Sequence, residues 1–579
     1  MTFEVNPILA CDFYKVGHVF QYPKNTEVIY SNFTPRSNRL APIVAGKQLE
    51  DVVCIGYASM VQEFLIESFN KNFFSKPVDE VVAEFDRRNN TSLGEGSVNS
   101  DHIRALHAIG FLPLEIKTLP EGTVTKCGIP HMTVRNTRGE DFQWITYWVT
   151  NALETLFSTE AWKISTNASI ALAYRRILQM YALETGTPLD FVLWQGHDFS
   201  MRGMSGIHDA ARSGVGHLAF FLGTDTIPAI QYAEEYFGAK GDFIGGSVPA
   251  TEHSVMCAGG FESELETFRR ITQDVYPSGI VSIVSDTWDF WNVLTVIAPK
   301  LKNVIMNRTP DALGNAKVVF RPDSGDPVEI LCGIEIENVD TIDEAADIMI
   351  DEEVESTPHG ECGSNVVSRI FRVAGKLQEV SVNLEWNRYD KQYYFYDGFY
   401  GLRSKDVELT PQQKGAVEVL WNEFGGTLTE KGYRMLDSHV GLIYGDSITP
   451  DRAYEILRRL KDKGFASGNV VFGIGSYTYQ YSTRDTFGFA MKATYGVFGG
   501  EGRELFKDPI TDRDANGNSV KKSAKGLLRV EYEGGKFVLY DQQTPEQEQQ
   551  GALRTIYKDG QMFNQETLGQ IRTRAASFI

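Results

Sequence analysis

One arrangement recurs between residues 190 and 480 of the chain: a short apolar run leads into a polar or glycine-rich loop, and a helical pattern follows. The apolar runs lie at 191–194, 280–284, 317–320, 440–443 and 469–472. Strands of a parallel sheet that is covered on both faces are continuously apolar. Repeated strand–loop–helix units are typical of α/β sheets and barrels. The repetition therefore predicts an α/β sheet or barrel in this part of the chain.

The loops after these runs contain side chains that suit an anionic ligand. They hold His197, Asp198, Asp286, Arg321, Asp323 and Asp446, and the glycines Gly473 and Gly475. In a parallel barrel such loops meet on one face, which holds the active site. Arginine binds phosphate oxygens in pairs of hydrogen bonds, Mg²⁺ prefers carboxylate and phosphate oxygens, and glycine lets backbone N–H groups approach a phosphate. The loops predict a site for a phosphorylated sugar with a divalent ion.

Each loop also has a purely structural interpretation. Gly473-Ile474-Gly475 fits a plain turn, and Arg321 with Asp323 fits a turn closed by an ion pair. His253 fits a hydrogen-bonded histidine of the core, and Asp225 fits the N-cap of a helix expected at 227–237. The number of such loops, at the ends of separate strands, favours one shared site over several unrelated explanations.

The net charge of −20 opposes non-specific binding to nucleic acid or to anionic membranes. The acidity is uneven, because no Lys or Arg occurs between Arg321 and Arg369, where 14 acidic residues fall. An anion-binding pocket elsewhere is therefore compatible with the charge. Within this acidic stretch, Thr341 and Glu344 match a capping box, which predicts a helix over 341–353 with a solvated acidic face rather than a metal or partner site.

The cellular setting follows from what the sequence lacks. No apolar run approaches the roughly 18–20 residues that span a bilayer, and the N-terminus has no secretion-signal pattern. The six cysteines are scattered, without C-x-x-C pairs or zinc-ligand spacing. We expect a cytoplasmic protein without nucleic-acid or membrane partners.

Three further elements have clear sequence signals. A helical stripe predicts a helix over 52–70. A second helix is expected to begin at Thr449, with Pro450 in its first turn, and to end at Gly464. Two alternating runs on either side of Gly534-Gly535 predict a β-hairpin over 526–540.

The residue sequences of the motifs resemble those of the nicotinamide phosphoribosyltransferases, and the motifs follow in the same order from about residue 7 to about residue 530. The motifs are Asp12-Phe-Tyr14-Lys15-x-x-His18, His197-Asp-Phe199-Ser-Met-Arg202-Gly203, Gly223-Thr-Asp225-Thr226, Ser247-Val-Pro-Ala-Thr-Glu-His253-Ser254, Val284-Ser-Asp286, Arg321-Pro-Asp323-Ser-Gly-Asp326-Pro327, Gly445-Asp446, Thr483-Arg484-Asp485 and Phe506-Lys507-Asp508-Pro509. The resemblance implies a type II phosphoribosyltransferase fold, in which an irregular α/β barrel packs against a mixed β-rich domain made from both chain ends. It also implies a homodimer with active sites at the subunit interface.

On this basis we expect residues 1–155 to form the N-terminal part of the mixed domain and residues 485–579 its C-terminal part. Residues 156–484 would form the barrel, with an acidic insert at about 335–430. The insert looks long relative to the shorter animal enzymes, which favours a bacterial or phage-type member.

The implied reaction joins nicotinamide to 5-phosphoribosyl 1-pyrophosphate and releases nicotinamide mononucleotide and pyrophosphate, a salvage step toward NAD. By the resemblance, Arg202 and Arg321 bind the diphosphate with Mg²⁺, for which no protein ligand is assigned. Asp323, Gly445 and Asp446 bind the ribose, and Gly475, Ser476, Arg484 and Lys492 receive the 5′-phosphate. Ser285 is a further substrate-binding residue. The phosphate loop departs from the family's run of glycines, because it reads Gly475-Ser476-Tyr477.

Nicotinamide is flat and neutral, which suits an aromatic sandwich of Phe199 and Tyr14 from the second subunit. Asp225 would accept a hydrogen bond from the carboxamide and repel nicotinate. His253 matches a histidine that ATP phosphorylates in the family, so we expect ATP as an activator and His253, Arg321 and Asp323 as catalytic residues. The competing expectations are a nicotinate phosphoribosyltransferase and a non-catalytic binding or signalling protein on the same fold.

Overall fold

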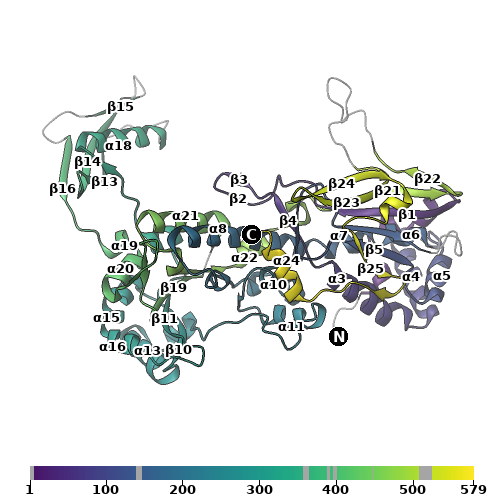
Figure 1. The fold of residues 1–579 in the computed structure, drawn as a ribbon, viewed down its shortest axis with the longest axis horizontal. Helices are drawn as coiled ribbons and strands as arrows, with labels where there is room; N and C mark the ends of the chain where they lie inside the picture. The colour runs from purple at the N-terminus through teal and green to yellow at the C-terminus, as the bar shows by residue number, and fades with distance from the viewer. Residues whose placement is uncertain are drawn as a thin grey trace.

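The computed structural model describes residues 5–137, 146–356, 364–387, 392–395, 401–445, 447–507 and 524–579 of the chain. Three parts are visible in Figure 1: a parallel barrel in the middle, an antiparallel sheet at one end and a small module at the other end. Among the helices of these ranges, none combines the length and the apolar composition needed to cross a bilayer.

The barrel is a six-stranded parallel sheet whose ends are joined by an extended segment. The strand order is β10 (Gly279–Val284), β11 (Ala316–Arg321), β19 (Val440–Tyr444), β20 (Val470–Ile474), β8 (Gly196–Asp198) and β9 (Gly223–Thr224). Residues 246–251 then run between the two edge strands. Thr224 N donates to Gly246 O at 3.0 Å, and Ser282 N of β10 donates to Pro249 O at 2.9 Å. This segment closes the sheet into an irregular barrel.

Burial on both faces explains why the barrel strands read as continuous apolar runs. All five residues of β19 are buried, and four of the five in β20. Outside the strands, α8 (Lys163–Thr185) packs against α10 (Ile207–Leu218) and α21 (Pro450–Asp462). Burial of apolar area at about 25 cal/mol per Å² makes this core the main stabilising contribution to the barrel.

The antiparallel sheet combines both ends of the chain: three purple-to-blue strands from the N-terminal part lie between yellow-green and yellow strands from the C-terminal part (Figure 1). Its order is β22 (Glu501–Glu504), β21 (Ala490–Phe498), β1 (Thr26–Thr34), β7 (Met132–Asn136), β5 (Leu114–Thr118), β25 (Arg554–Lys558) and β26 (Gln561–Met562). The buried ion pair between Lys117 and Glu548, with Nζ and Oε2 3.0 Å apart, also joins the two ends.

Within the acidic insert expected at about 335–430, the described residues of 338–406 form a module of their own, which projects from the barrel at the end away from the antiparallel sheet (Figure 1). The predicted end of the insert is too late, because α20 (Ala416–Phe424) is buried in the core of the barrel. The module contains α18 (Ile342–Ser356), β12 (Asn338–Val339), β13 (Ser364–Val373), β14 (Lys376–Asn387), β15 (Gln392–Phe395) and β16 (Leu402–Asp406). Ala345 and Met349 of α18 pack on Phe371, Val380 and Val382 of the sheet. The module thus has a small core separate from that of the barrel.

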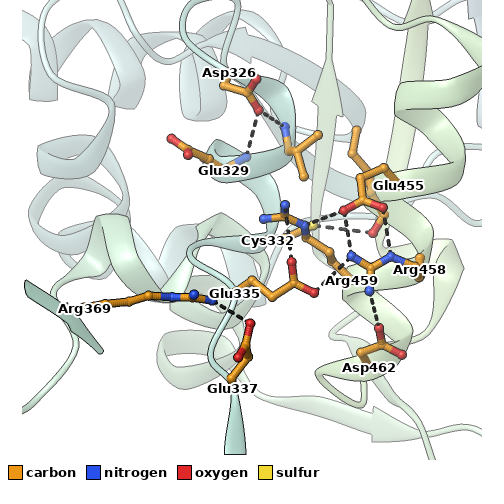
Figure 2. Close-up of polar contacts among 12 residues, drawn as sticks. Asp326, Glu329, Cys332, Glu335, Glu337, Arg369, Glu455, Arg458, Arg459 and Asp462 are labelled. Atoms are coloured by element: carbon orange, nitrogen blue, oxygen red, sulfur yellow. Dashed lines mark hydrogen bonds and ion pairs between the residues drawn. The ribbon is translucent and has the colours of Figure 1, made fainter. Parts of the chain in front are cut away.

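A network of charged side chains joins the module to the barrel (Figure 2). Helix α17 (Pro327–Cys332) has Asp326 as its N-cap, and the Asp326 carboxylate accepts hydrogen bonds from Val328 N and Glu329 N. After α17, Glu335 pairs with Arg458 of α21 at 3.0 Å, and Glu337 pairs with Arg369 of β13 at 2.8 Å.

The structure confirms most of the predicted elements. Helix α21 has Thr449 as its N-cap, α18 lies over the predicted acidic helix, α11 (Ile227–Tyr236) lies over the helix expected at 227–237, and β23 (Leu527–Glu533) with β24 (Lys536–Gln543) forms the hairpin.

Two predicted elements are wrong. The run 191–194 lies mostly in a short helix, α9 (Val192–Gln195), and the strand β8 comes after it. A four-residue apolar run does not distinguish strand from helix. The helix expected over 52–70 starts only at Tyr57, because β4 (Asp51–Cys54) pairs with the distant β6 (Thr123–Lys126).

We predict that the network in Figure 2 stabilises the fold in a pH-dependent way. The hydrogen bonds from Arg458 and then Arg459 lower the pKa of Glu455 to about 2. Glu455→Gln should lower the free energy of unfolding by only about 0.5–1 kcal/mol at neutral pH, because both side chains of the pair are partly exposed to solvent. Since the folded pKa is below the unfolded value of 4.5, this difference should persist above about pH 5 and shrink as the pH falls toward 2. Urea unfolding at several pH values measures it, and a pH-independent difference would contradict the assignment.

Candidate active site

The carboxyl ends of the barrel strands bring most of the predicted residues to one rim. Phe199 follows β8, Asp225 follows β9, Ser285 and Asp286 follow β10, Arg321 ends β11 with Asp323 just beyond, Gly445 follows β19, and Gly475 and Ser476 follow β20. Backbone hydrogen bonds fix neighbouring members: Phe199 N donates to Ile474 O, and Ser285 N donates to Arg321 O, both at 3.0 Å. The rim is therefore part of the barrel's own hydrogen-bonding pattern.

Asp225 is held by two donors. His197 Nε2 lies 2.9 Å from Asp225 Oδ1, and the Ser247 hydroxyl donates to the same oxygen. Burial acts to raise the pKa of Asp225, but the hydrogen bonds from His197 and Ser247 and the charge of Arg321 bring it below its ordinary value. The interpretation of Asp225 as a helix cap is wrong, because Thr226 is the N-cap residue of α11.

Arg321 has the features of an anion-binding group. One terminal nitrogen donates to Thr251 O at 2.8 Å, while its buried Nε has no hydrogen-bond partner among the described residues. Burial lowers its pKa, partly offset by the charge of Asp323, while Arg202 adds repulsion. No ion pair of Arg321 within 4.0 Å occurs in the described ranges, so the ion-pair turn is not what forms. The buried guanidinium of Arg321, which has a donor without a partner and lies near Arg202, is suited to bind an oxyanion.

Asp286 organises the neighbouring loop. Its Oδ2 accepts hydrogen bonds from Asp323 N at 2.8 Å and from the Ser324 hydroxyl. Its Oδ1 lies 3.3 Å from His253 Nε2, at the start of α12 (His253–Ala258). The His253 side chain is 47% exposed, so the interpretation as a core histidine is wrong.

Three glycines allow the rim to close tightly. A Cβ on Gly473 would lie 2.5 Å from the Phe199 ring, and one on Gly445 would lie 2.9 Å from Asp323 Oδ1. A Cβ on Gly203 would overlap Ser476, which places the Arg202 loop against the start of α22 (Ser476–Gln480). Gly473 lies inside β20 and makes room for Phe199, so the plain-turn interpretation fails there.

Three predicted residues lie outside this rim. Tyr14, in α1 (Phe13–Val16), is 61% exposed and contacts its own neighbour His18, with ring centroids 5.3 Å apart. Arg484 lies in the short helix η9 (Arg484–Thr486) beside Asp485. Lys492 lies on β21, opposite Asn32 of β1. Asp446 lies outside the described residues, as do Asp508 and Pro509.

The role of Ser247 was not predicted from the sequence. The residue lies in the segment that closes the barrel, and its hydroxyl reaches Asp225 across the closure. The sequence shows a serine directly after Gly245-Gly246. Its proximity to Asp225 follows only from the pairing of this segment with strands that are distant in the chain.

The described residues contain no cluster of three or more His, Cys, Asp or Glu side chains able to hold a metal ion. Asp286 already accepts two hydrogen bonds and faces His253. A divalent ion at this rim would depend on oxygen ligands that a phosphorylated substrate brings with it.

We predict that Gly473→Ala destabilises the protein by about 1–3 kcal/mol, because the added methyl group forces the Phe199 ring to move. Gly475→Ala is the matched control, since a Cβ there meets no atom within 4 Å. Urea unfolding of both variants measures the difference. Equal stability of the two variants would show that Gly473 does not make room for Phe199.

Comparisons with known proteins identify the family of the chain. The model of the nicotinate phosphoribosyltransferase (NAPRTase) family matches residues 194–355 and 369–561. A nicotinamide phosphoribosyltransferase from Acinetobacter baylyi is 50% identical over 576 residues, covering 100% of this chain and 98% of the relative. One from Mycoplasma pneumoniae is 29% identical over 515 residues, covering 87% and 92%.

Among solved structures, a nicotinate-nucleotide pyrophosphorylase from Pyrococcus furiosus superimposes with a TM-score of 0.52 at 12% identity, covering 100% of this chain and 96% of that one. This likeness confirms the expected fold class, an irregular α/β barrel with a mixed β-rich domain. The match of the family model and the 50% identity over the whole chain show that the protein belongs to the nicotinate phosphoribosyltransferase family.

Proposed function

We propose that the chain is a nicotinamide phosphoribosyltransferase, which condenses nicotinamide with 5-phosphoribosyl 1-pyrophosphate in NAD salvage. The observation that carries the proposal is Asp225, an ionised acceptor near Arg321 that is hydrogen-bonded to His197, whose ring lies against Phe199. A flat amide needs an aromatic face and an acceptor, and a diphosphate needs cations. The name of the Acinetobacter baylyi relative agrees with this assignment.

The chemistry suits these groups. The pyridine nitrogen forms a bond to the anomeric carbon of the ribose while the bond from that carbon to the pyrophosphate oxygen breaks. Arg202 and Arg321 would stabilise the charge that develops on the leaving group, and Asp323 and Gly445 would orient the ribose. Mg²⁺, when bound with the diphosphate, would supply further charge neutralisation, and no protein ligand is assigned to it.

The remaining substrate contacts would come from two copies of the chain. Tyr14 would complete the sandwich on Phe199 from the second subunit, and its 61% exposure beside the exposed Phe13 leaves it available. Gly475 and Ser476, with Arg484 and Lys492, would receive the 5′-phosphate. We therefore propose a homodimer. A reducing cytoplasm is the setting that we propose for it, and the five cysteines of the described residues, which are free thiols, agree with that setting.

ATP would act through His253. The half-exposed imidazole has Nε2 beside Asp286, so a ring nitrogen can take the γ-phosphoryl group as ADP leaves. The new negative charge at this rim would change how pyrophosphate is held.

Two alternatives remain testable. A nicotinate phosphoribosyltransferase is suggested by the family's name, but the charge of Asp225 opposes a carboxylate substrate. A non-catalytic protein is disfavoured because Arg202, His253, Arg321 and Asp323 are all present.

The direct test measures pyrophosphate release with nicotinamide and with nicotinate. We expect clear preference for nicotinamide in the natural protein, and equal or better use of nicotinate would overturn the proposal. In Asp225→Asn the preference should fall by about tenfold or more, because the repulsive charge is lost. Asp311→Asn, in the loop before β11 at the opposite end of the barrel, is the matched control. An unchanged preference in Asp225→Asn would exclude its role.

We also predict that γ-labelled ATP leaves an acid-labile phosphate on His253. The label should be lost in His253→Ala and kept in His208→Ala, where another exposed histidine is removed. A label that persists in His253→Ala would show that a different residue accepts the phosphate.

A further inference from the structure

His197 occupies a position between the substrate-facing acid and the barrel backbone. It lies on β8, and its side chain is only 10% exposed. Its Nε2 is 2.9 Å from Asp225 Oδ1. Because an ionised carboxylate can only accept hydrogen bonds, Nε2 must carry the hydrogen in this pair.

The imidazole has little freedom to turn. On one side, a Cβ at Gly223 would lie 2.6 Å from His197 Nδ1, so the ring packs directly against the backbone of β9. On the other, the ring of Phe199 lies with its centroid 4.8 Å away. Gly223 is itself fixed, because its carbonyl oxygen lies 2.9 Å from His217 Nε2. The glycine and the phenylalanine therefore keep His197 Nε2 directed at Asp225.

The two donors on Asp225 act on one oxygen. Ser247 donates to Oδ1 as well, and its hydroxyl lies 3.4 Å from His197 Nε2. Oδ1 thus receives both protein donors, and Oδ2 is the oxygen to which neither of them bonds. A carboxamide NH₂ group needs one such acceptor in a fixed direction.

We infer that His197 is a positioning residue that sets the specificity of the site for a neutral carboxamide: by engaging Oδ1 of Asp225, it directs Oδ2 toward the substrate. This inference deepens the proposed function and rests on it. His197 does not touch the reacting atoms in this assignment, and it acts through Asp225 alone.

The same contact affects the pH range in which the acid is ionised. The titratable groups around Asp225 are His197 and Asp198 from β8 and Arg321 from β11, and Ser247 adds an uncharged donor. Without the hydrogen bond from His197, the pKa of Asp225 should rise. Nicotinamide use requires the ionised form, so the acid limb of kcat/KM against pH should move to higher pH.

The experiment compares His197→Gln with His197→Asn. The longer glutamine amide reaches the place of Nε2, whereas the asparagine amide reaches only that of Nδ1. In His197→Asn we expect KM for nicotinamide to rise by about tenfold and the nicotinamide-over-nicotinate ratio of kcat/KM to fall by a similar factor. The fall in kcat should be smaller. The acid limb should move to higher pH, and His197→Gln should restore most of the ratio.

Two further variants keep the test decisive. His107→Asn makes the same exchange in α5 (Asp101–Ile109), outside the barrel, and should leave the ratio unchanged. Gly223→Ala keeps the imidazole of His197 but displaces it. It should therefore lower the nicotinamide-over-nicotinate ratio as His197→Asn does, and it replaces His197→Asn in the test if His197→Asn fails to fold.

The inference is overturned if His197→Asn and His197→Gln both keep the nicotinamide-over-nicotinate ratio and the acid limb of the natural protein. It is also overturned if kcat falls in His197→Asn while that ratio stays constant. Absence of turnover of nicotinamide by the natural protein is a different result, which would reject the proposed function itself.

Discussion

The closure of the barrel by residues 246–251 is the constraint on which the site depends. This segment hydrogen-bonds to β9 at one end and to β10 at the other. It thereby places Ser247 beside Asp225 and the carbonyl oxygen of Thr251 beside Arg321. One stretch of extended chain positions both the acid that would face a pyridine and the cation that would face a phosphate.

The rim also balances its own charges in a way that favours an anionic ligand. Arg321 is surrounded by Asp225, Asp286 and Asp323, yet its buried Nε has no partner in the described ranges and Arg202 repels it. An unsatisfied buried donor costs roughly 1–3 kcal/mol, which a bound oxyanion would recover. The acids nearby already accept hydrogen bonds, Asp225 from His197 and Asp286 from the Asp323 amide. The vacant hydrogen-bonding capacity is therefore mainly on the cationic side.

The sequence predicted those site residues whose position follows from the order of the barrel strands. Loops after parallel strands must meet at one edge, so Asp225, Asp286 and Arg321 can be grouped from the order of their motifs along the chain. The strand β8 was misplaced by a few residues, because its His197 and Asp198 serve the site and lack the apolar pattern of the other strands. The closure segment could not be predicted, since its pairing joins residues far apart in the chain.

The acidic insert shows how one chain can be strongly negative and still bind phosphates. The acids of α18 lie on a module that projects from the barrel, and the charge network at its base pairs Glu335 and Glu337 with Arg458 and Arg369. Screening at physiological salt reduces exposed charge interactions beyond about 8 Å. Helices α17 and α21 each follow the carboxyl end of a barrel strand, and the residues that pair with the insert lie toward or beyond their C-terminal ends, so the insert is attached away from the rim. Distance and pairing together leave the local field at the rim to the arginines and aspartates of the rim itself, while much of the net charge of −20 comes from the acidic insert.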